Sequence, residues 1–382
     1  MPVSPALAED LAAAISMLYE DAELALIDIL RRAVAEGIDS PRWAELKART
    51  VGDLREAVEE VAASLEQDAT GAVAAALAVA YDRGQQAAVA ELGALDTGRE
   101  AQARRVTPNA PAVDRLAASY AQDTRPLYQR ITRSILDVFR TVTTQAAGTQ
   151  LLTGQTRRAA SQRALNAFAQ RGVTGFVDRS GRSWELAAYA EMAVRSVAAR
   201  AAIEGHIDAL ANVGVGLVIV SDAPLECPLC RPWEGKVLSL TGAAGEQTLT
   251  VEHTMQPGGL RALFQPPETV QVQVAGTLAE ARGAGLFHPN CRHSLAAYLP
   301  GVTTRPPRHA TPGTTYEDTQ RQRAIERHIR EWKRRQAAAL DDDARARAGA
   351  YVRRWQAAAR EHVAAHEHLT RKPAREQIGK AR

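Results

Sequence analysis

Aromatic residues, cysteines and long apolar runs are all scarce in this 382-residue sequence. Phe, Trp and Tyr make up 5% of the chain whereas alanine is frequent, a balance that favours long helices with small side chains at their contacts. No apolar run approaches the roughly 18 residues needed to cross a bilayer, so we expect no membrane association. Met1–Asp10 lacks the features of a signal peptide, and three cysteines, an odd number, argue against a disulfide framework. We therefore expect the protein to be made in a cytosol and to stay there or enter a particle.

Charge is distributed unevenly along the chain. Arg321–Arg382 holds 17 Lys+Arg and 8 Asp+Glu, a net charge of +9. Since the whole chain has a net charge of +3, the first 320 residues have a net charge of −6. A basic C-terminal arm on an acidic body can contact nucleic acid or an acidic protein surface. Acidic residues interrupt the basic run, however, and a solvated helix followed by a tail explains the same pattern.

Helical periodicity dominates the N-terminal half. The first helix should end near Gly37, and a second helical stretch should run from Trp43 to Leu92 with a break at Thr70 and Gly71. The period changes at Gly214, where Leu217–Val220 is a short β-branched run that predicts a strand.

The C-terminal part should again be helical. Asp341–Asp343 is expected to cap a break within a helical region that starts near Thr315, and the last dozen residues should be disordered. The predicted fold class is mainly α with a small α+β module. The predicted parts are a long N-terminal helical region (1–95), a linker (96–112), a helical domain (113–213), a small α+β Cys/His module (214–300), a linker (301–314) and a basic helical arm and tail (315–382).

All three cysteines lie in one segment, together with two histidines. Cys227 and Cys230 form a C-x-x-C pair, and His288, Cys291 and His293 follow far downstream. Two thiolates at this spacing can hold one face of a tetrahedral zinc ion, and Cys291 with either histidine can complete it. So many soft ligands predict a closed, structural zinc site. The alternative is a metal-free pair of turns with buried thiols and a hydrogen-bonded histidine.

Catalytic motifs fit the sequence poorly. A zinc deaminase needs proline before its C-x-x-C pair and an H-x-E motif, but here Glu226 precedes the pair and the nearest upstream motif ends in Asp208. The histidines at 362, 366 and 368 do not form H-E-x-x-H because Val363 occupies the glutamate position, and a solvated helix face explains them. A nucleophilic pair of Cys291 with a nearby histidine stays open, although nothing in the local sequence requires it.

A set of short motifs occurs in a fixed order in the second half of the chain. It comprises Asp178–Trp184, Tyr189–Met192 with Arg195, Leu217–Asp222, Cys227–Lys236, the Leu-Ser-Leu-Thr-Gly ending at Gly242 and Gly285–His293, and the later residues Tyr316, Gln320, Arg321 and Ile325–Lys333. Through these motifs, residues 176–300 resemble the phage minor capsid protein 2 group, which is related to the Mu F-like head-morphogenesis proteins. One departure is His293, where some relatives have cysteine, and it leaves the choice of the fourth zinc ligand open.

The resemblance implies a minor head protein of a tailed phage, present in few copies in the virion and in the host cytoplasm during assembly. Its implied place is the portal vertex, in head assembly and DNA packaging or ejection. Its implied partners are the portal protein, other head proteins and packaged DNA, which the basic arm would contact; no catalytic residue is implied. Two alternatives of other classes are a zinc-dependent nucleic-acid-processing enzyme and a DNA-binding module.

Overall fold

The computed structural model describes residues 9–104, 109–153, 156–172, 174–177, 183–222, 228–242, 244–250, 269–288, 291, 293–303 and 315–379. These residues form a helical unit (13–72, 121–191 and 313–382) and a sheet unit (1–12, 73–120 and 192–312), each assembled from three separate stretches of sequence. The units are thus interleaved along the chain. No helix among the described residues is long and apolar enough to cross a membrane.

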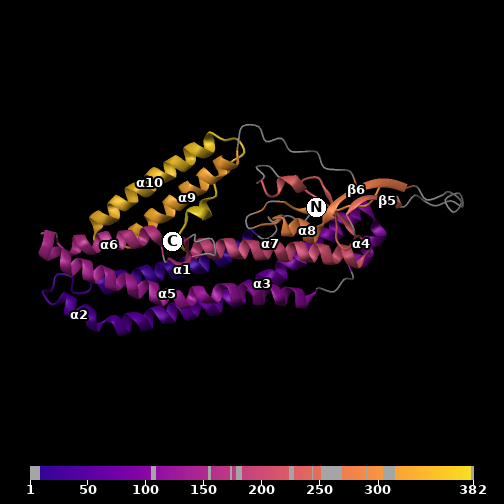
Figure 1. Ribbon diagram of the computed structural model, residues 1–382. Helices are drawn as coiled ribbons and strands as arrows, with labels where there is room; N and C mark the ends of the chain where they lie inside the picture. Colours follow the sequence, from indigo (N-terminus) through magenta and orange to yellow (C-terminus); the bar gives the residue numbers. More distant parts are fainter. Residues whose placement is uncertain are drawn as a thin grey trace. The chain divides into compact units, whose positions relative to one another are not determined.

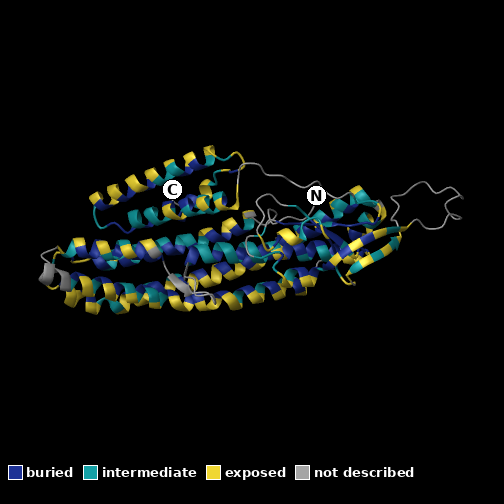
Figure 2. Ribbon diagram, turned by 45° about the horizontal axis from the view of Figure 1, so that its top comes forward, coloured by how far each residue is buried: buried dark blue, intermediate teal, exposed yellow. Residues whose placement is uncertain are grey.

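Ten α-helices account for most of the described residues, which confirms the mainly α fold class (Figure 1). They are α1 (Glu9–Ala35), α2 (Trp43–Arg49), α3 (Val51–Leu95), α4 (Thr97–Ala103), α5 (Ala110–Thr153), α6 (Arg157–Arg171), α7 (Leu186–Asn212), α8 (Leu278–Gly283), α9 (Tyr316–Ala337) and α10 (Asp342–Ala364). Figure 2 shows buried and exposed residues alternating along them, as expected for amphipathic helices.

The predicted break at Thr70 and Gly71 is wrong, because α3 continues through both residues. Gly71 is exposed, and Ala69 and Val73 on either side of it are buried at 0% and 1% exposure. Thr70 Oγ1 also donates a hydrogen bond to the carbonyl oxygen of Glu66 at 2.6 Å, within the same helix. Tertiary packing of the buried face therefore outweighs the weak helix propensity of one glycine.

The segment 96–112, expected to be a linker, contains helix α4 and the start of α5. The Asp96 carboxylate accepts hydrogen bonds from the amides of Gly98 and Arg99 at 2.9 and 3.0 Å, which caps α4. Pro111 lies in the first turn of α5, where its missing N–H is not needed. Polar residues and proline thus mark helix N-termini here.

A buried ion cluster holds the helical unit together. The Arg334 side chain is 1% exposed and forms two hydrogen bonds with the Glu185 carboxylate, at 2.9 and 3.1 Å. Its Nε donates to the carbonyl oxygen of Ala169 at 2.9 Å, and Glu23, 2% exposed, lies 3.9 Å away. The cluster joins α1, α6, α9 and the short strand β2 (Ser183–Glu185), which pairs with β1 (Thr174–Val177).

Helices α9 and α10 lie side by side as a hairpin in the helical unit (Figure 1). Asp341 caps α10, as predicted, with its carboxylate accepting from the amide of Ala344 at 2.7 Å. The expectation of a solvated histidine face is wrong for His362, which is buried with its Nε2 2.9 Å from the carbonyl oxygen of Asp318. This contact ties the end of α10 to the start of α9.

The predicted disorder of the last dozen residues is wrong for the described part of that tail. A 3-10 helix, η4 (Pro373–Glu376), follows α10, and Ile378 is 6% exposed. The amide of Gly379 donates to the Glu20 carboxylate at 3.0 Å. Apolar burial and this long-range hydrogen bond order a tail whose local sequence carries little structural signal.

The sheet unit contains a mixed five-stranded sheet in the order β5-β6-β4-β3-β7. Its strands are β3 (Leu217–Val220), β4 (Val237–Ser239), β5 (Gly245–Thr250), β6 (Thr269–Thr277) and β7 (Leu295–Ala297). The strand predicted at Leu217–Val220 is confirmed. β4 and β6 are parallel and the other neighbours antiparallel, around a small core of Ile219, Val237, Val272, Val274 and Tyr298.

Helices α3 and α7 meet backbone to backbone within the sheet unit. A Cβ atom added to Gly84 would lie 1.9 Å from the carbonyl oxygen of Ala202, and one added to Gly205 would lie 2.1 Å from that of Tyr81. Buried alanines flank both glycines, and the Tyr81 hydroxyl donates to the Asp208 carboxylate at 2.5 Å. The expectation of helices that meet through small side chains is confirmed at this crossing.

We predict opposite effects for two glycine-to-alanine substitutions in α3. Gly84→Ala should lower the free energy of unfolding by about 1–3 kcal/mol, since the new methyl group would force α3 and α7 apart. Gly71→Ala is the matched control: nothing lies within 4 Å of its added Cβ, so the substitution should raise stability by up to about 1 kcal/mol. Urea unfolding followed by circular dichroism measures both. Equal effects of the two variants would contradict the close crossing.

We also predict a pH dependence that originates at Glu20. Burial raises the pKa of Glu20 from its ordinary 4.5 to about 7, against the opposing effects of the Gly379 amide and Arg330, while Glu191 and Glu23 raise it further. Because the folded pKa is the higher one, the contribution of Glu20 to stability is complete below about pH 4.5 and is lost as pH rises to about 7.

Glu20→Gln tests this dependence, because glutamine can still accept the Gly379 hydrogen bond but cannot ionise. Between about pH 4.5 and 7 the variant should gain stability relative to the parent protein, with no further change at higher pH. Urea unfolding at a series of pH values gives the difference directly. A pH-independent difference would show that Glu20 does not titrate in this way.

Candidate metal centre

The first loop of the candidate site connects β3 to β4 in the sheet unit. Its ends are held together by the hydrogen bonds Val220 N–H to Lys236 O, 3.0 Å, and Gly235 N–H to Val220 O, 3.1 Å. Cys230 lies inside the loop, directly before the short 3-10 helix η2 (Arg231–Trp233), and is fully buried. The paired strands therefore hold both ends of the loop that contains Cys230.

The second loop connects α8 to β7. Phe287, immediately before His288, has a φ of +61°, a backbone conformation that a bulky residue rarely adopts. A hydrogen bond from the amide of Cys291 to the carbonyl oxygen of His288, 2.9 Å, joins these two residues. Ser294 then bonds to Ser221 at the start of the first loop, through both its amide and its carbonyl oxygen. The two loops are thus fastened next to each other.

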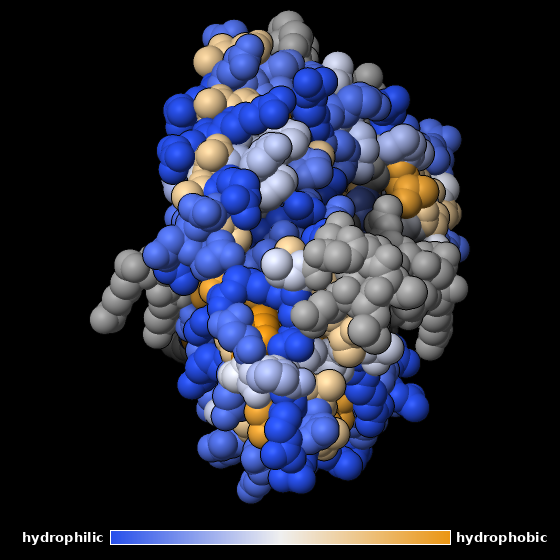
Figure 3. Space-filling model, turned by 90° about the vertical axis from the view of Figure 1, so that its left-hand side faces the viewer, coloured by the Kyte–Doolittle hydropathy of each residue, from blue (hydrophilic) through white to orange (hydrophobic). Residues whose placement is uncertain are grey.

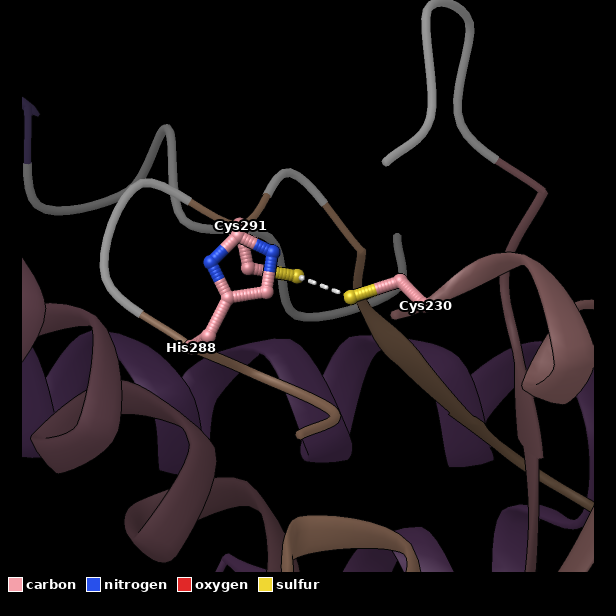
Figure 4. A group of neighbouring side chains, drawn as sticks. All are labelled: Cys230, His288 and Cys291. Carbon is pink, nitrogen blue, oxygen red and sulfur yellow. Dashed lines mark hydrogen bonds between the residues drawn. The ribbon is translucent and has the colours of Figure 1, made fainter. Parts of the chain in front are cut away.

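Cys230, His288 and Cys291 come together where these loops meet (Figure 4). The two sulfur atoms are 3.5 Å apart, and one ligand atom from each of the three residues lies within 4.8 Å of the others. Figure 4 shows the His288 ring beside Cys291, with Cys230 approaching that thiol from the other loop. Within the described residues, this is the group whose side chains could jointly hold a metal ion.

His293 contacts Cys291 but does not belong to that group. Its Nδ1 is 3.3 Å from the Cys291 sulfur, and its amide donates to the same sulfur at 3.4 Å. Its Nε2 lies 2.6 Å from Oε1 of Glu234, which belongs to the first loop, and the His293 side chain is 2% exposed. Cys291, His293 and Glu234 thus form a chain of contacts leading away from the three-residue group.

The electrostatics of these contacts favour a negatively charged Cys291 beside a positively charged His293. The hydrogen bond from Cys230, together with contacts to His293, lowers the pKa of the Cys291 thiol to about 4 despite burial. Burial disfavours a charged His293, but its contacts with Cys291 and Glu234 outweigh burial and raise the pKa of the imidazole. The arrangement therefore stabilises a sulfur anion at Cys291.

Of the five residues predicted from sequence, the structure brings four close together, with His293 beside the group rather than in it. The fifth, Cys227, lies outside the described residues. Sequence reasoning missed Glu234, although it lies within the Cys227–Lys236 motif. Only its position in that motif could have drawn attention to it, since a glutamate far from any histidine in sequence carries no metal signature.

A second buried histidine anchors the loops to the helices. His206 on α7 is fully buried, with its Nε2 2.9 Å from the Glu91 carboxylate on α3. The other oxygen of that carboxylate accepts from the amide of Ala297 on β7 at 2.9 Å. Both contacts are structural, and they fix β7 and the second loop against the helices of the sheet unit.

The fold and this site define a class of protein: mainly helical, with a small α+β module that carries a Cys–His group on two adjacent loops. The chain belongs to the phage minor capsid protein 2 family, which matches residues 3–364.

Two curated relatives carry the name structural protein. One, from Lactococcus phage LL-H, is 28% identical over 210 residues, covering 53% of this chain and 51% of the relative. The other, from Lactococcus phage mv4, is 35% identical over 101 residues, covering 25% of this chain and 82% of the relative. This chain thus spans about half the length of the LL-H protein. No solved structure shows significant similarity to this chain.

Proposed function

We propose that this chain is a minor structural protein of the head of a tailed phage, located at the portal vertex of the virion. It acts there in head assembly and in DNA packaging or ejection, without a catalytic role. The observation that carries this proposal is the family match over residues 3–364, which extends across both the helical and the sheet unit. The two relatives named as structural proteins support it.

The surface of the helices suits docking onto other head proteins. Long helices such as α3 and α5 offer ridges and grooves into which the helices of a neighbouring subunit can pack. On the face drawn in Figure 3 the surface is mainly hydrophilic, with hydrophobic residues confined to small patches. A contact through that face would therefore rest largely on polar groups, and we propose the portal protein as its partner.

We predict a low, constant copy number in purified virions. A single vertex offers few binding positions, so quantitative mass spectrometry of nuclease-treated virions should find this chain in a small fixed ratio to the major capsid protein. Chemical cross-linking should join it to the portal protein. Absence from both proheads and mature virions would refute the structural role, and cross-links confined to other head proteins would refute the portal position.

We further propose that the α9–α10 hairpin contacts packaged DNA. Besides Arg345, which pairs with Asp342 at 3.3 Å, four arginines on α10 are exposed. They are Arg347, Arg353, Arg354 and Arg360. Guanidinium groups on an accessible helix surface can neutralise DNA phosphates and release condensed counterions.

Replacing these four arginines by glutamine should weaken DNA binding. The slope of log affinity against log salt should also become shallower, by about 0.9 for each phosphate that the variant no longer neutralises. The matched control replaces four exposed arginines elsewhere, namely Arg49, Arg115, Arg125 and Arg133. Fluorescence anisotropy with a random-sequence duplex measures both variants, and equal reductions in affinity would show that only net charge matters.

The absence of a catalytic role has its own test. The full chain should not hydrolyse or deaminate DNA or nucleotides in the presence of Zn²⁺. An activity that disappears in a folded Cys230→Ser variant would contradict the structural role and favour a zinc-dependent enzyme.

A further inference from the structure

We propose that the sheet unit binds one structural Zn²⁺ ion through the sulfurs of Cys230 and Cys291 and the imidazole of His288, while His293 and Glu234 position Cys291 without touching the ion. The ligand types and the distances between them carry this inference. It is independent of the phage role, because it concerns the purified chain alone.

The separation of the sulfur atoms fits a shared metal ion. Two sulfurs at about 2.3 Å from a tetrahedral zinc lie about 3.8 Å from each other. The observed separation between Cys230 and Cys291 is 3.5 Å, far longer than the roughly 2.05 Å of a disulfide bond. His288 contributes the third ligand atom, within 4.8 Å of both sulfurs. Small side-chain adjustments are enough to place all three around one ion.

The chemistry of the ligands selects zinc over other cations. Cys230 is fully buried, and His288 and Cys291 are partly buried. Thiolate and imidazole are ligands that zinc prefers, whereas calcium and magnesium prefer oxygen. A site of this composition is typical of a structural zinc centre.

The two histidines have different roles because their ring atoms lie in different places. Nδ1 of His293 is 3.3 Å from the Cys291 sulfur and Nε2 is 2.6 Å from Glu234, but His293 is not among the residues whose ligand atoms all lie within 4.8 Å of one another. His293 therefore contacts a ligating sulfur without belonging to the group that surrounds the ion. His288, by contrast, belongs to the group that can surround an ion.

The described residues supply three ligand atoms, and the spectrum proposed below identifies the fourth. Cys227, which lies outside the described residues, is separated from Cys230 by two residues, the spacing of a zinc knuckle. A third sulfur at the ion would support that prediction, and its absence would leave the three described ligands in place.

Such an ion would stabilise a unit whose apolar core is small. It would join the β3–β4 loop to the α8–β7 loop, which are far apart in sequence. Because it binds the folded chain and not the unfolded one, saturating zinc should raise the melting temperature by about 5–10 °C over chelator-treated protein.

The test uses the full chain, purified under reducing conditions from zinc-supplemented medium. Elemental mass spectrometry should find about one zinc per chain, and X-ray absorption at the zinc edge should show at least two sulfur neighbours and one nitrogen, with a third sulfur if Cys227 is the fourth ligand. Two sulfurs and two nitrogens, with zinc lost in His293→Ala, would make His293 a ligand and overturn its positioning role.

Variants separate ligands from positioning residues. Cys230→Ser, Cys291→Ser and His288→Ala should lose stoichiometric zinc. His293→Ala and Glu234→Gln should keep one zinc per chain but bind it about 10–100-fold more weakly, measured by competition with a chromogenic chelator. The matched control is His368→Ala, an exposed histidine in the helical unit, which should bind zinc like the parent protein.

Three results would overturn the proposal. One is a folded parent protein that contains no zinc and does not take it up from solution. The second is full zinc retention in Cys230→Ser. The third is a Cys230–Cys291 disulfide in protein purified without reductant from zinc-supplemented medium. The absorption spectrum of the parent protein decides the ligand set even if a variant does not fold. None of these results bears on the presence of the chain in virions, so the two proposals fail separately.

Discussion

The backbone contact between α3 and α7 is the constraint on which the rest of the sheet unit depends. Gly84 and Gly205 let the carbonyl groups of the facing helices approach within distances that no larger residue permits. Close approach increases the number of dispersion contacts along both helices, and it places the end of α7 in a fixed position. The first strand of the sheet, β3, begins five residues after α7 ends.

The crossing of α3 and α7 also positions the candidate metal centre. Glu91 on α3 bonds to His206 on α7 and to the amide of Ala297 on β7, so one carboxylate links two helices to the sheet. The neighbouring strands β3 and β7 then hold the two loops whose ends are tied by Ser221 and Ser294. A site that needs atoms placed to a fraction of an ångström is thus built on rigid elements, although its candidate ligands lie in loops.

In the helical unit, segments that are far apart in sequence are joined by a buried ion cluster rather than by close packing of backbones. Arg334 lies almost fully buried with Glu23 and Glu185, and it joins segments that are far apart in sequence. Removing one member would leave a buried charge without its partner, which typically costs about 3–5 kcal/mol. The hydrogen bond from Arg334 to the end of α6 adds a directional restraint that an apolar side chain could not supply. This geometry specifies how α9 meets its neighbours within the unit.

Local sequence determined the elements whose signal is local. Helix periodicity, the β-branched run at Leu217–Val220 and the cap at Asp341 each depend on neighbouring residues, and the spacing of cysteines and histidines indicated where a Cys–His group would form. Tertiary structure alone decided that α3 continues through Gly71, that the tail packs near Glu20, and that His293 turns toward Glu234. The physical reason is that burial and hydrogen bonds between residues far apart in sequence set these features, and they outweigh the weaker local preferences.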